Sequence, residues 1–234
     1  MQRLWLRRWM LGAGAALAMC SGAQAAPDFS GYWQIDRPVT QLRTADGKTP
    51  PLLPAAQTEY NQHLQARSRG DTAFDTTNRC LPPGVPRLMM LPSPFEIVQR
   101  PGFLIMLFQY QHLNRQIFLA DQHTHSALGR RFLGDSIAGW DGDTLVVDTT
   151  GFKDDTLLDD SGLPHSRELH VVERYWLLGS GRLEARVRIE DAKTYAEPWE
   201  TTLRFRRLRN VQFKEDVCTD RHPEWLQETE QENR

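Results

Sequence analysis

The sequence predicts a mostly β protein, a single antiparallel, barrel-like domain with a short N-terminal helix. From residue 95 onward, short segments rich in β-branched and aromatic residues follow one another, and tight turn sequences join many of them as hairpins. Some of these segments alternate apolar and polar residues, the pattern of a strand with one buried face. A helix is expected over only one segment. About nine or ten short strands with few helices favour a barrel or a strongly curved sandwich.

The first 26 residues have the anatomy of a cleaved secretory signal. Three arginines lie near the start, an apolar run covers 10–19, and Ala23-Gln24-Ala25 offers the A-x-A cleavage site. The apolar run is too short to span a bilayer as a stable helix. We therefore expect the mature protein to start near Ala26 and to work in the periplasm or outside the cell.

Two alternatives for this segment remain open. Cys20 could carry a lipid, although Met19 stands where a lipoprotein signal has a small side chain. Arg7 and Arg8 fit a twin-arginine signal only loosely and equally fit a plain basic start, so the export route stays undecided.

Composition limits the partners of the mature chain. Cleavage removes three arginines and no acid, which leaves 25 Lys and Arg against 30 Asp and Glu, a net charge of −5. This charge disfavours nucleic acid and anionic membranes as main partners. About 209 residues are enough for one domain with a full core. No second membrane-spanning stretch follows, and no dinucleotide or phosphate-binding fingerprint occurs, so we expect no integral membrane segment and no cofactor.

The domain, residues 27–234, divides into three zones along the chain. An irregular and helical cover over 27–94 contains a strand at 31–37, a helix at 55–67 that starts after Pro54, and a proline-rich loop at 75–94. The β zone runs from 95 to 218, and a polar tail follows from 219 to 234. We expect the strands of the β zone at 95–99, 103–110, 115–120, 136–140, 144–149, 168–178, 182–190, 199–208 and 212–217.

Two cysteines, Cys80 and Cys218, remain after cleavage of the signal. An exported chain with an even cysteine count favours a disulfide over a catalytic thiol. In the chain-entropy model, closing a loop of this length stabilises the fold by roughly 4–5 kcal/mol. The bond would fasten the C-terminal segment to the proline-rich loop.

The segment 159–174 is dense in residues that perform acid–base chemistry. His165 and His170 are candidate general acids or bases, and Asp159 and Glu173 are candidates to orient them. If the face with Glu173 points inward, its carboxylate needs a cationic partner or a raised pKa. The structural alternative is an ion pair between Glu173 and an arginine of a neighbouring strand.

The opposite face of the same strand carries His170, Arg174 and Trp176, which would line the cavity if that face points inward. A second polar cluster, around Tyr110, His112 and Arg115, lies where one strand ends and the next begins. Ligands commonly bind at a barrel mouth, and Arg115 could hold an anionic group. A polar hairpin loop is the alternative for this cluster.

Metal and serine chemistry find weaker support. His123 and His125, near Asp121, alternate like ligands on one strand, but no further ligand pair accompanies them. Four aspartates at 154, 155, 159 and 160 do not follow the order of an EF-hand loop. Ser136 lacks the G-x-S-x-G spacing and precedes a hairpin, whereas a nucleophile elbow needs a strand-to-helix turn. We therefore predict no metal site and no serine nucleophile.

The start of the mature chain, with Gly31-Tyr32-Trp33, resembles the Gly-x-Trp signature of lipocalins and other calycins. The resemblance implies that Trp33 plugs the barrel floor and that an arginine of a late strand stacks on it. Arg204, Arg206 and Arg207 are the candidates for that partner.

Longer motifs resemble those of a largely uncharacterised family of exported bacterial β-rich proteins. They are CLPPGVPR at 80–87, PFEIVQ at 94–99, GDTLVVDT at 142–149, PHS at 164–166 and LHVVER at 169–174. This resemblance brings no activity to carry over.

These observations favour an exported protein that binds a small, partly apolar ligand in the cavity of its barrel. The same cavity could also catalyse a reaction. One alternative is a cofactor-free lyase, isomerase or hydrolase that uses His165 or His170 as the general acid or base. Another is an envelope interaction protein without a pocket.

Overall fold

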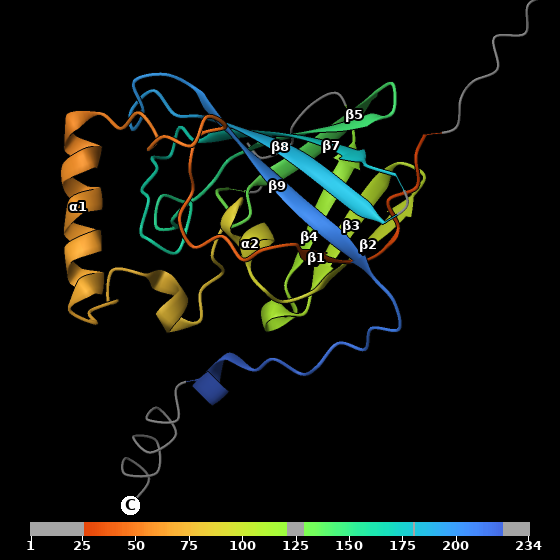
Figure 1. Ribbon diagram of the computed structural model, residues 1–234, viewed down its shortest axis with the longest axis horizontal. Helices are drawn as coiled ribbons and strands as arrows, with labels where there is room; N and C mark the ends of the chain where they lie inside the picture. Colours follow the sequence, from red (N-terminus) through yellow and green to blue (C-terminus); the bar gives the residue numbers. More distant parts are fainter. Residues whose placement is uncertain (1–25, 121–128, 180, 222–234) are drawn as a thin grey trace, which may run out of the picture.

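The computed structural model describes residues 26–120, 129–179 and 181–221, and the nine strands found there form a closed barrel (Figure 1). The mostly β, barrel-like fold expected from the sequence is confirmed. The strands are β1 (Gly31–Ile35), β2 (Phe95–Arg100), β3 (Phe103–Phe108), β4 (Asn114–Leu119), β5 (Asp135–Asp141), β6 (Thr144–Thr150), β7 (His170–Leu177), β8 (Arg182–Glu190) and β9 (Trp199–Leu208).

Neighbouring strands are antiparallel with one exception. β1 pairs with both β2 and β9 and so closes the barrel, while β4 and β5 run parallel. The parallel ladder has three residue pairs, from Ile117 opposite Ser136 to Leu119 opposite Ala138. A parallel pair needs a crossover connection instead of a tight turn. The expected antiparallel, barrel-like domain did not include this parallel pair, because the expectation was built from hairpins.

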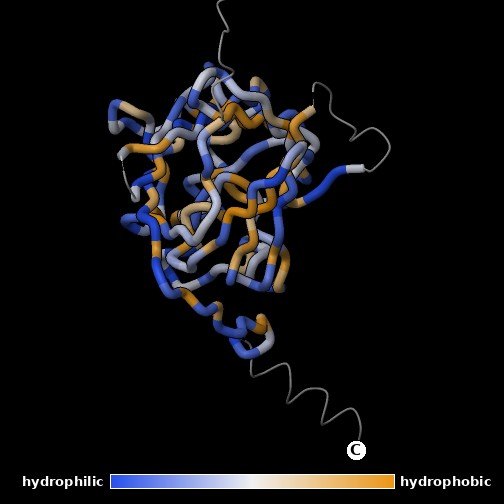
Figure 2. Tube along the Cα trace, turned by 90° about the vertical axis from the view of Figure 1, so that its right-hand side faces the viewer, coloured by the Kyte–Doolittle hydropathy of each residue, from blue (hydrophilic) through white to orange (hydrophobic). Residues whose placement is uncertain are grey.

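The hairpin turns follow the residues that predicted them. Gly142 has a φ of 58° in the turn between β5 and β6, and Gly102 has a φ of 86° between β2 and β3. Both lie in the left-handed region, where glycine has no Cβ penalty. Along β8, Leu183, Val187 and Ile189 are fully buried, as the alternation of that strand predicts. Hydrophobic stretches gather in the body of the barrel (Figure 2).

Trp33 closes one part of the core. Its ring is fully buried, and its Nε1 donates a hydrogen bond to the Phe29 carbonyl at 2.9 Å. The guanidinium of Arg207 lies 4.5 Å from the ring centroid and donates to the Ser30 carbonyl at 2.8 Å. Gly31 makes room for this arrangement, since a Cβ there would lie 2.8 Å from Arg207 Nη1. Of the three arginines considered for this position, Arg207 is therefore the one that stacks on Trp33.

The N-terminal cover lies beside the barrel. Helix α1 (Pro54–Ser68) begins at a proline, which is tolerated in the first turn of a helix, and it packs against the connection between β6 and β7. There His63 Nδ1 lies 2.7 Å from the Gly162 carbonyl, and the Tyr60 hydroxyl lies 2.7 Å from Ser161 Oγ. No helix among the described residues is long and apolar enough to cross a membrane.

Two local expectations are wrong. The 75–94 segment contains a 3₁₀ helix (Thr76–Arg79) and a short helix α2 (Arg87–Met90). Residues Leu88, Met89 and Met90 of α2 are buried, and one helical turn places all three against the core. The segment 212–217 is not a strand. With β1 paired to both β2 and β9, the barrel is already closed, so this segment has no open edge to join.

Candidate functional site

A buried ion pair crosses the barrel interior. Arg115 on β4 donates from Nη1 to Glu173 Oε1 on β7 at 3.0 Å and from Nη2 to Glu173 Oε2. Both side chains are only 1% exposed. Burial alone would lower the pKa of Arg115, but the charge of Glu173 and its hydrogen bonds raise it above its usual value. The Glu173 face of β7 therefore points inward, and the structural ion pair considered for it is present with an arginine from β4, which is not a neighbouring strand.

Neutral hydroxyl groups complete this network. The Tyr175 hydroxyl donates to Glu173 Oε1 at 2.6 Å, and Arg115 donates to Ser136 Oγ at 3.2 Å and to Thr149 Oγ1 at 2.9 Å. Burial and the adjacent carboxylate raise the pKa of Tyr175 well above its ordinary value, which keeps the phenol protonated. A buried charge pair with this many hydrogen bonds is rigid and holds its members in one arrangement.

A surface cleft of about 460 Å³ opens over this network, beside the start of the short parallel ladder. We call it the β4–β5 cleft. Arg115 and Ser136 form its floor, and Phe118, which is 47% exposed, contributes to its apolar wall. Its remaining lining residues are Pro82, Asn114, Gln116, Arg131, Phe132, Leu133, Gly134 and Asp135. The cleft is thus lined mostly by polar groups, with an apolar part formed by Pro82, Phe118, Phe132 and Leu133.

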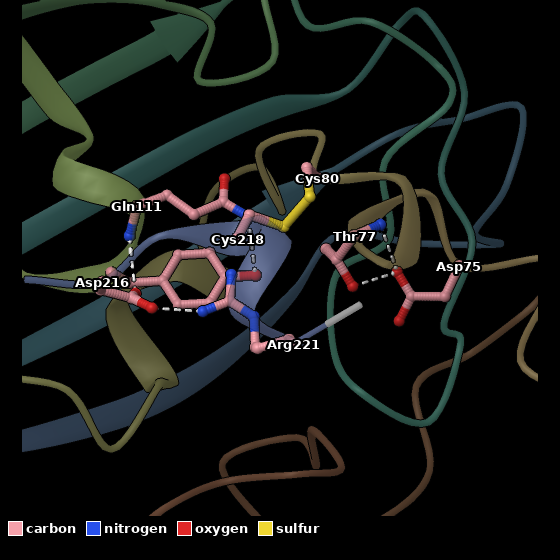
Figure 3. Close-up of a disulfide and its surroundings, with 8 residues drawn as sticks. Asp75, Thr77, Cys80, Gln111, Asp216, Cys218 and Arg221 are labelled. Atoms are coloured by element: carbon pink, nitrogen blue, oxygen red, sulfur yellow. Dashed lines mark hydrogen bonds and ion pairs between the residues drawn. A yellow bond between two sulfur atoms is a disulfide. The ribbon is translucent and has the colours of Figure 1, made fainter. Parts of the chain in front are cut away.

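Tyr110 and His112 contact the segment that ends the described chain, residues 211–221, which we call the C-terminal strap. Figure 3 shows the strap residues Asp216, Cys218 and Arg221 beside Cys80 and Gln111, whose backbone amide donates to Asp216 Oδ2 at 2.8 Å. Cys218 of the strap is bonded to Cys80, which confirms the predicted disulfide, with the Cα atoms 5.7 Å apart. The guanidinium of Arg221 lies 5.0 Å from the Tyr110 ring centroid, and the Asp216 amide donates to His112 Nε2 at 3.3 Å. Burial raises the pKa of Tyr110.

Neither the disulfide nor the strap lines the β4–β5 cleft, although Pro82 in its wall is two residues from Cys80 in the chain. Tyr110 and His112 contact the strap, whereas Arg115 reaches the cleft itself. Their predicted ligand-binding roles stay predictions.

Asp159 is fully buried and organises the loop between β6 and β7. Its carboxylate accepts hydrogen bonds from the backbone amides of Leu42, Ser161 and Leu163 at 2.8, 2.9 and 3.1 Å. Burial raises the pKa of Asp159, and these hydrogen bonds oppose the increase. The carboxylate joins the N-terminal cover to the loop. The nearest histidine in sequence, His165, is not among these partners.

His165 is buried, and both of its ring nitrogens are occupied. Nδ1 lies 2.9 Å from the Ser166 carbonyl, and Nε2 lies 2.7 Å from the Thr156 hydroxyl. Because a carbonyl only accepts hydrogen bonds, Nδ1 carries the proton and Nε2 accepts from Thr156. Burial lowers the pKa of His165 and favours this neutral form. In this arrangement neither nitrogen is open to a ligand.

His170 lies on the outer face of β7, together with Arg174 and Trp176. Its ring is held between two carboxylates, with Nε2 3.0 Å from Asp148 Oδ1 and Nδ1 3.2 Å from Glu190 Oε2. The hydrogen bond to Asp148 raises the pKa of His170 above its ordinary value. Arg174 pairs with Asp141, the last residue of β5, and the ring of Trp176 faces Arg186 of β8. These three side chains therefore do not meet Arg115 and Glu173.

Several residues of the site were not predicted from the sequence. Thr149 and Tyr175 gave no signal of their own, and Ser136 was considered only as a nucleophile. A second buried cluster was also missed, in which Arg87 donates two hydrogen bonds to Asp75, at 2.9 and 2.6 Å, and one to Asp160 at 2.8 Å. The only sequence signal for this cluster was the position of Arg87 directly before the apolar residues Leu88, Met89 and Met90.

The described residues contain no group of three or more His, Cys, Asp or Glu side chains arranged to hold a metal ion. His123, His125 and Asp121 lie outside the described residues. Ser136 lies on a strand and its hydroxyl contacts Arg115 and Thr149. Two of the acidic residues considered for calcium, Asp154 and Asp160, pair with arginines.

The chain was also compared with known proteins. No protein-family model matches it. No curated protein matches it closely enough to be counted as a relative.

Proposed function

We propose that this protein binds a small, partly apolar molecule at the end of its barrel, in the β4–β5 cleft. The observation that carries the proposal is the floor of that cleft, where Arg115 and Ser136 of the buried network lie beside the apolar side chains of the lining. Small-molecule sites place a few fixed polar groups beside apolar and aromatic side chains. A volume of about 460 Å³ lies within the usual range for such sites, about 300–1,000 Å³.

The polar groups of the cleft suggest the chemistry of the ligand. Arg115 cannot change position without breaking its bonds to Glu173, so it offers a preorganised floor. Arg131 at the rim makes no ion pair with any residue that the structure describes. Phe118 and Phe132 offer aromatic surface beside these cations. A ligand with an apolar ring or chain and one acceptor group, such as a carboxylate or carbonyl, matches this arrangement.

The test is a thermal-shift panel of aromatic acids, fatty acids and sugars, followed by calorimetry on each hit. Phe118→Ala should weaken a genuine hit by about tenfold, since it removes a large apolar contact. Leu178→Ala is the matched control, because Leu178 is also a large exposed apolar residue, at 42%, and does not line the cleft. A hit with equal affinity in wild type and Phe118→Ala would show that the ligand binds elsewhere and would contradict the proposal. A panel in which no compound binds would also contradict it.

A second candidate function, acid–base catalysis without a cofactor, is favoured by the position of His170. Its ring lines two clefts, one beside Arg130 and Gly151 and the other beside Tyr195 and Ala192. An imidazolium held by two carboxylates can donate a proton to a bound substrate. A lyase, isomerase or hydrolase would then work on the outer wall of the barrel.

The two candidates can be separated with one double variant, His165→Ala with His170→Ala. A carrier should keep its ligand affinity, whereas an enzyme that uses either residue as acid or base should lose turnover by roughly 10²–10⁴-fold. A third candidate, an interaction protein, needs a contiguous apolar patch. The large exposed hydrophobic residues of the described chain, Phe118, Leu178 and Val217, lie on three separate segments of it, which gives that candidate less support.

A further inference from the structure

A second cleft, of about 520 Å³, lies where the end of β1 runs beside β9. We call it the arginine cleft because Arg37, Arg182 and Arg204 line it. The other lining residues are Ile35, Asp36, Val39, Thr202 and Leu203. It shares no residue with the β4–β5 cleft.

Two of the three arginines have no partner among the residues that the structure describes. The side chains of Arg37 and Arg182 are exposed and make no hydrogen bond or ion pair there. Arg204 is held by Glu184, with Nε 2.6 Å from Oε2. The guanidinium groups of Arg37 and Arg182 are therefore available to a ligand.

The strand register adds a fourth cation to this region. Arg182 on β8 lies directly opposite Arg206 on β9, and Arg206 donates a hydrogen bond to Gln34 of β1. Like charges directly opposite each other in an antiparallel pair destabilise it. The full chain carries 30 acidic residues against 28 Lys and Arg, so a general excess of cations does not explain this arrangement. The opposed arginines cost stability locally, and a bound anion would offset that cost.

The charge balance of the cleft favours an anion even after its own acid is counted. Three arginines and one aspartate line it, an excess of two positive charges, and Glu184 partly neutralises Arg204 from outside the lining. Ile35 and Leu203, both buried, form its apolar base. Asp36 would repel a ligand that approached its side of the cleft, so the anion should lie toward Arg37 and Arg182.

We propose that the arginine cleft is a second binding site, for ligands that carry a phosphate or sulfate group, with Arg37 and Arg182 as the main contacts. The planar, forked guanidinium group matches the oxygens of these tetrahedral anions and can donate two parallel hydrogen bonds to them. This site is independent of the ligand proposed for the β4–β5 cleft.

Isothermal titration calorimetry of the purified protein with inorganic pyrophosphate and with sulfate tests the proposal. Co-sedimentation with vesicles of phosphatidylglycerol in phosphatidylcholine tests whether a lipid headgroup is the source of the phosphate. The critical variant is Arg37→Gln with Arg182→Gln. The matched control is Arg100→Gln, an exposed arginine at the β2–β3 turn that does not line the cleft.

We expect saturable binding of pyrophosphate or of the vesicles that weakens as salt is added. The double variant should lose at least about tenfold in affinity, because hydrogen bonds between charged groups contribute that much or more. The control should bind as wild type does. Binding to vesicles but not to pyrophosphate, with the same dependence on the variant, would support the proposal and identify a lipid headgroup as the ligand. Absence of binding to every probe, or equal binding by wild type and the double variant, would overturn it.

Discussion

Replacing Glu173 with glutamine should destabilise the barrel strongly. The variant keeps the shape of the side chain but offers one oxygen where the carboxylate offers two. In the wild type, these two oxygens accept from both terminal nitrogens of Arg115 and from the Tyr175 hydroxyl. In the variant an amide NH₂ would face one of these donors, and the charge of Arg115 would be left unpaired. Both side chains are 1% exposed, so water cannot replace the lost contacts.

Removal of one partner from a buried ion pair typically costs about 3–5 kcal/mol. For a domain of this size, each kcal/mol lowers Tm by about 2–4 °C, so Tm should fall by roughly 6–20 °C. The double variant Arg115→Met with Glu173→Leu should recover much of the loss, because apolar pairs of similar volume often replace buried ion pairs without cost. Chemical unfolding, followed by tryptophan fluorescence and circular dichroism under oxidising conditions, measures both effects.

The exposed pair between Arg174 and Asp141 is the matched control for the buried one. Arg174 is the next residue on β7, and the two side chains of this pair are 43% and 68% exposed. Asp141→Asn should therefore cost less than about 1 kcal/mol. The reasoning would be refuted if Glu173→Gln cost no more than Asp141→Asn, or if the double variant Arg115→Met with Glu173→Leu were at least as unstable as Glu173→Gln.

Three further predictions concern other parts of the molecule. Replacing Cys80 and Cys218 with serine should remove up to about 4–5 kcal/mol of stability and make the C-terminal strap the first site of limited proteolysis; unchanged resistance would contradict this. His170 has a raised pKa in the folded state, so its contribution to stability is fully present below its unfolded pKa of about 6.5 and is lost as pH rises through the folded value. The stability difference between wild type and His170→Ala should therefore shrink from pH 6 to pH 8 in urea titrations, and a difference that grows would refute the sign. Arg207→Ala should cost about 1 kcal/mol or more through loss of its contact with Trp33, while Arg207→Lys should retain part of it, and equal losses would argue against the stacked cation.

Much of the fold was predictable because its signals are local. Gly102 and Gly142 mark turns through backbone conformation, and the alternation along β8 marks its buried face. The disulfide followed from the cysteine count and the expected compartment. The predicted strand at 212–217 failed because a strand needs a partner edge, and a closed barrel offers none.

The site was predictable only in part. Sequence spacing identified Arg115 and Glu173 as residues that need an explanation, and it limited Glu173 to one of two faces of β7. It could not pair them, since β5 and β6 lie between their strands and the contact depends on how the whole barrel closes. The same holds for the two clefts, whose linings come from several separate parts of the chain.

The sequence by itself determined the secondary structure of most strands, the β class of the fold, the disulfide and the set of ionisable residues that require partners. These properties depend on neighbours within a few residues or on composition. Tertiary structure alone decided that Glu173 faces Arg115, that His165 is enclosed and His170 only half-buried, that β4 and β5 run parallel, and that free arginines gather beside β1. Each of these depends on strand order and register, which bring together residues that are far apart in the chain.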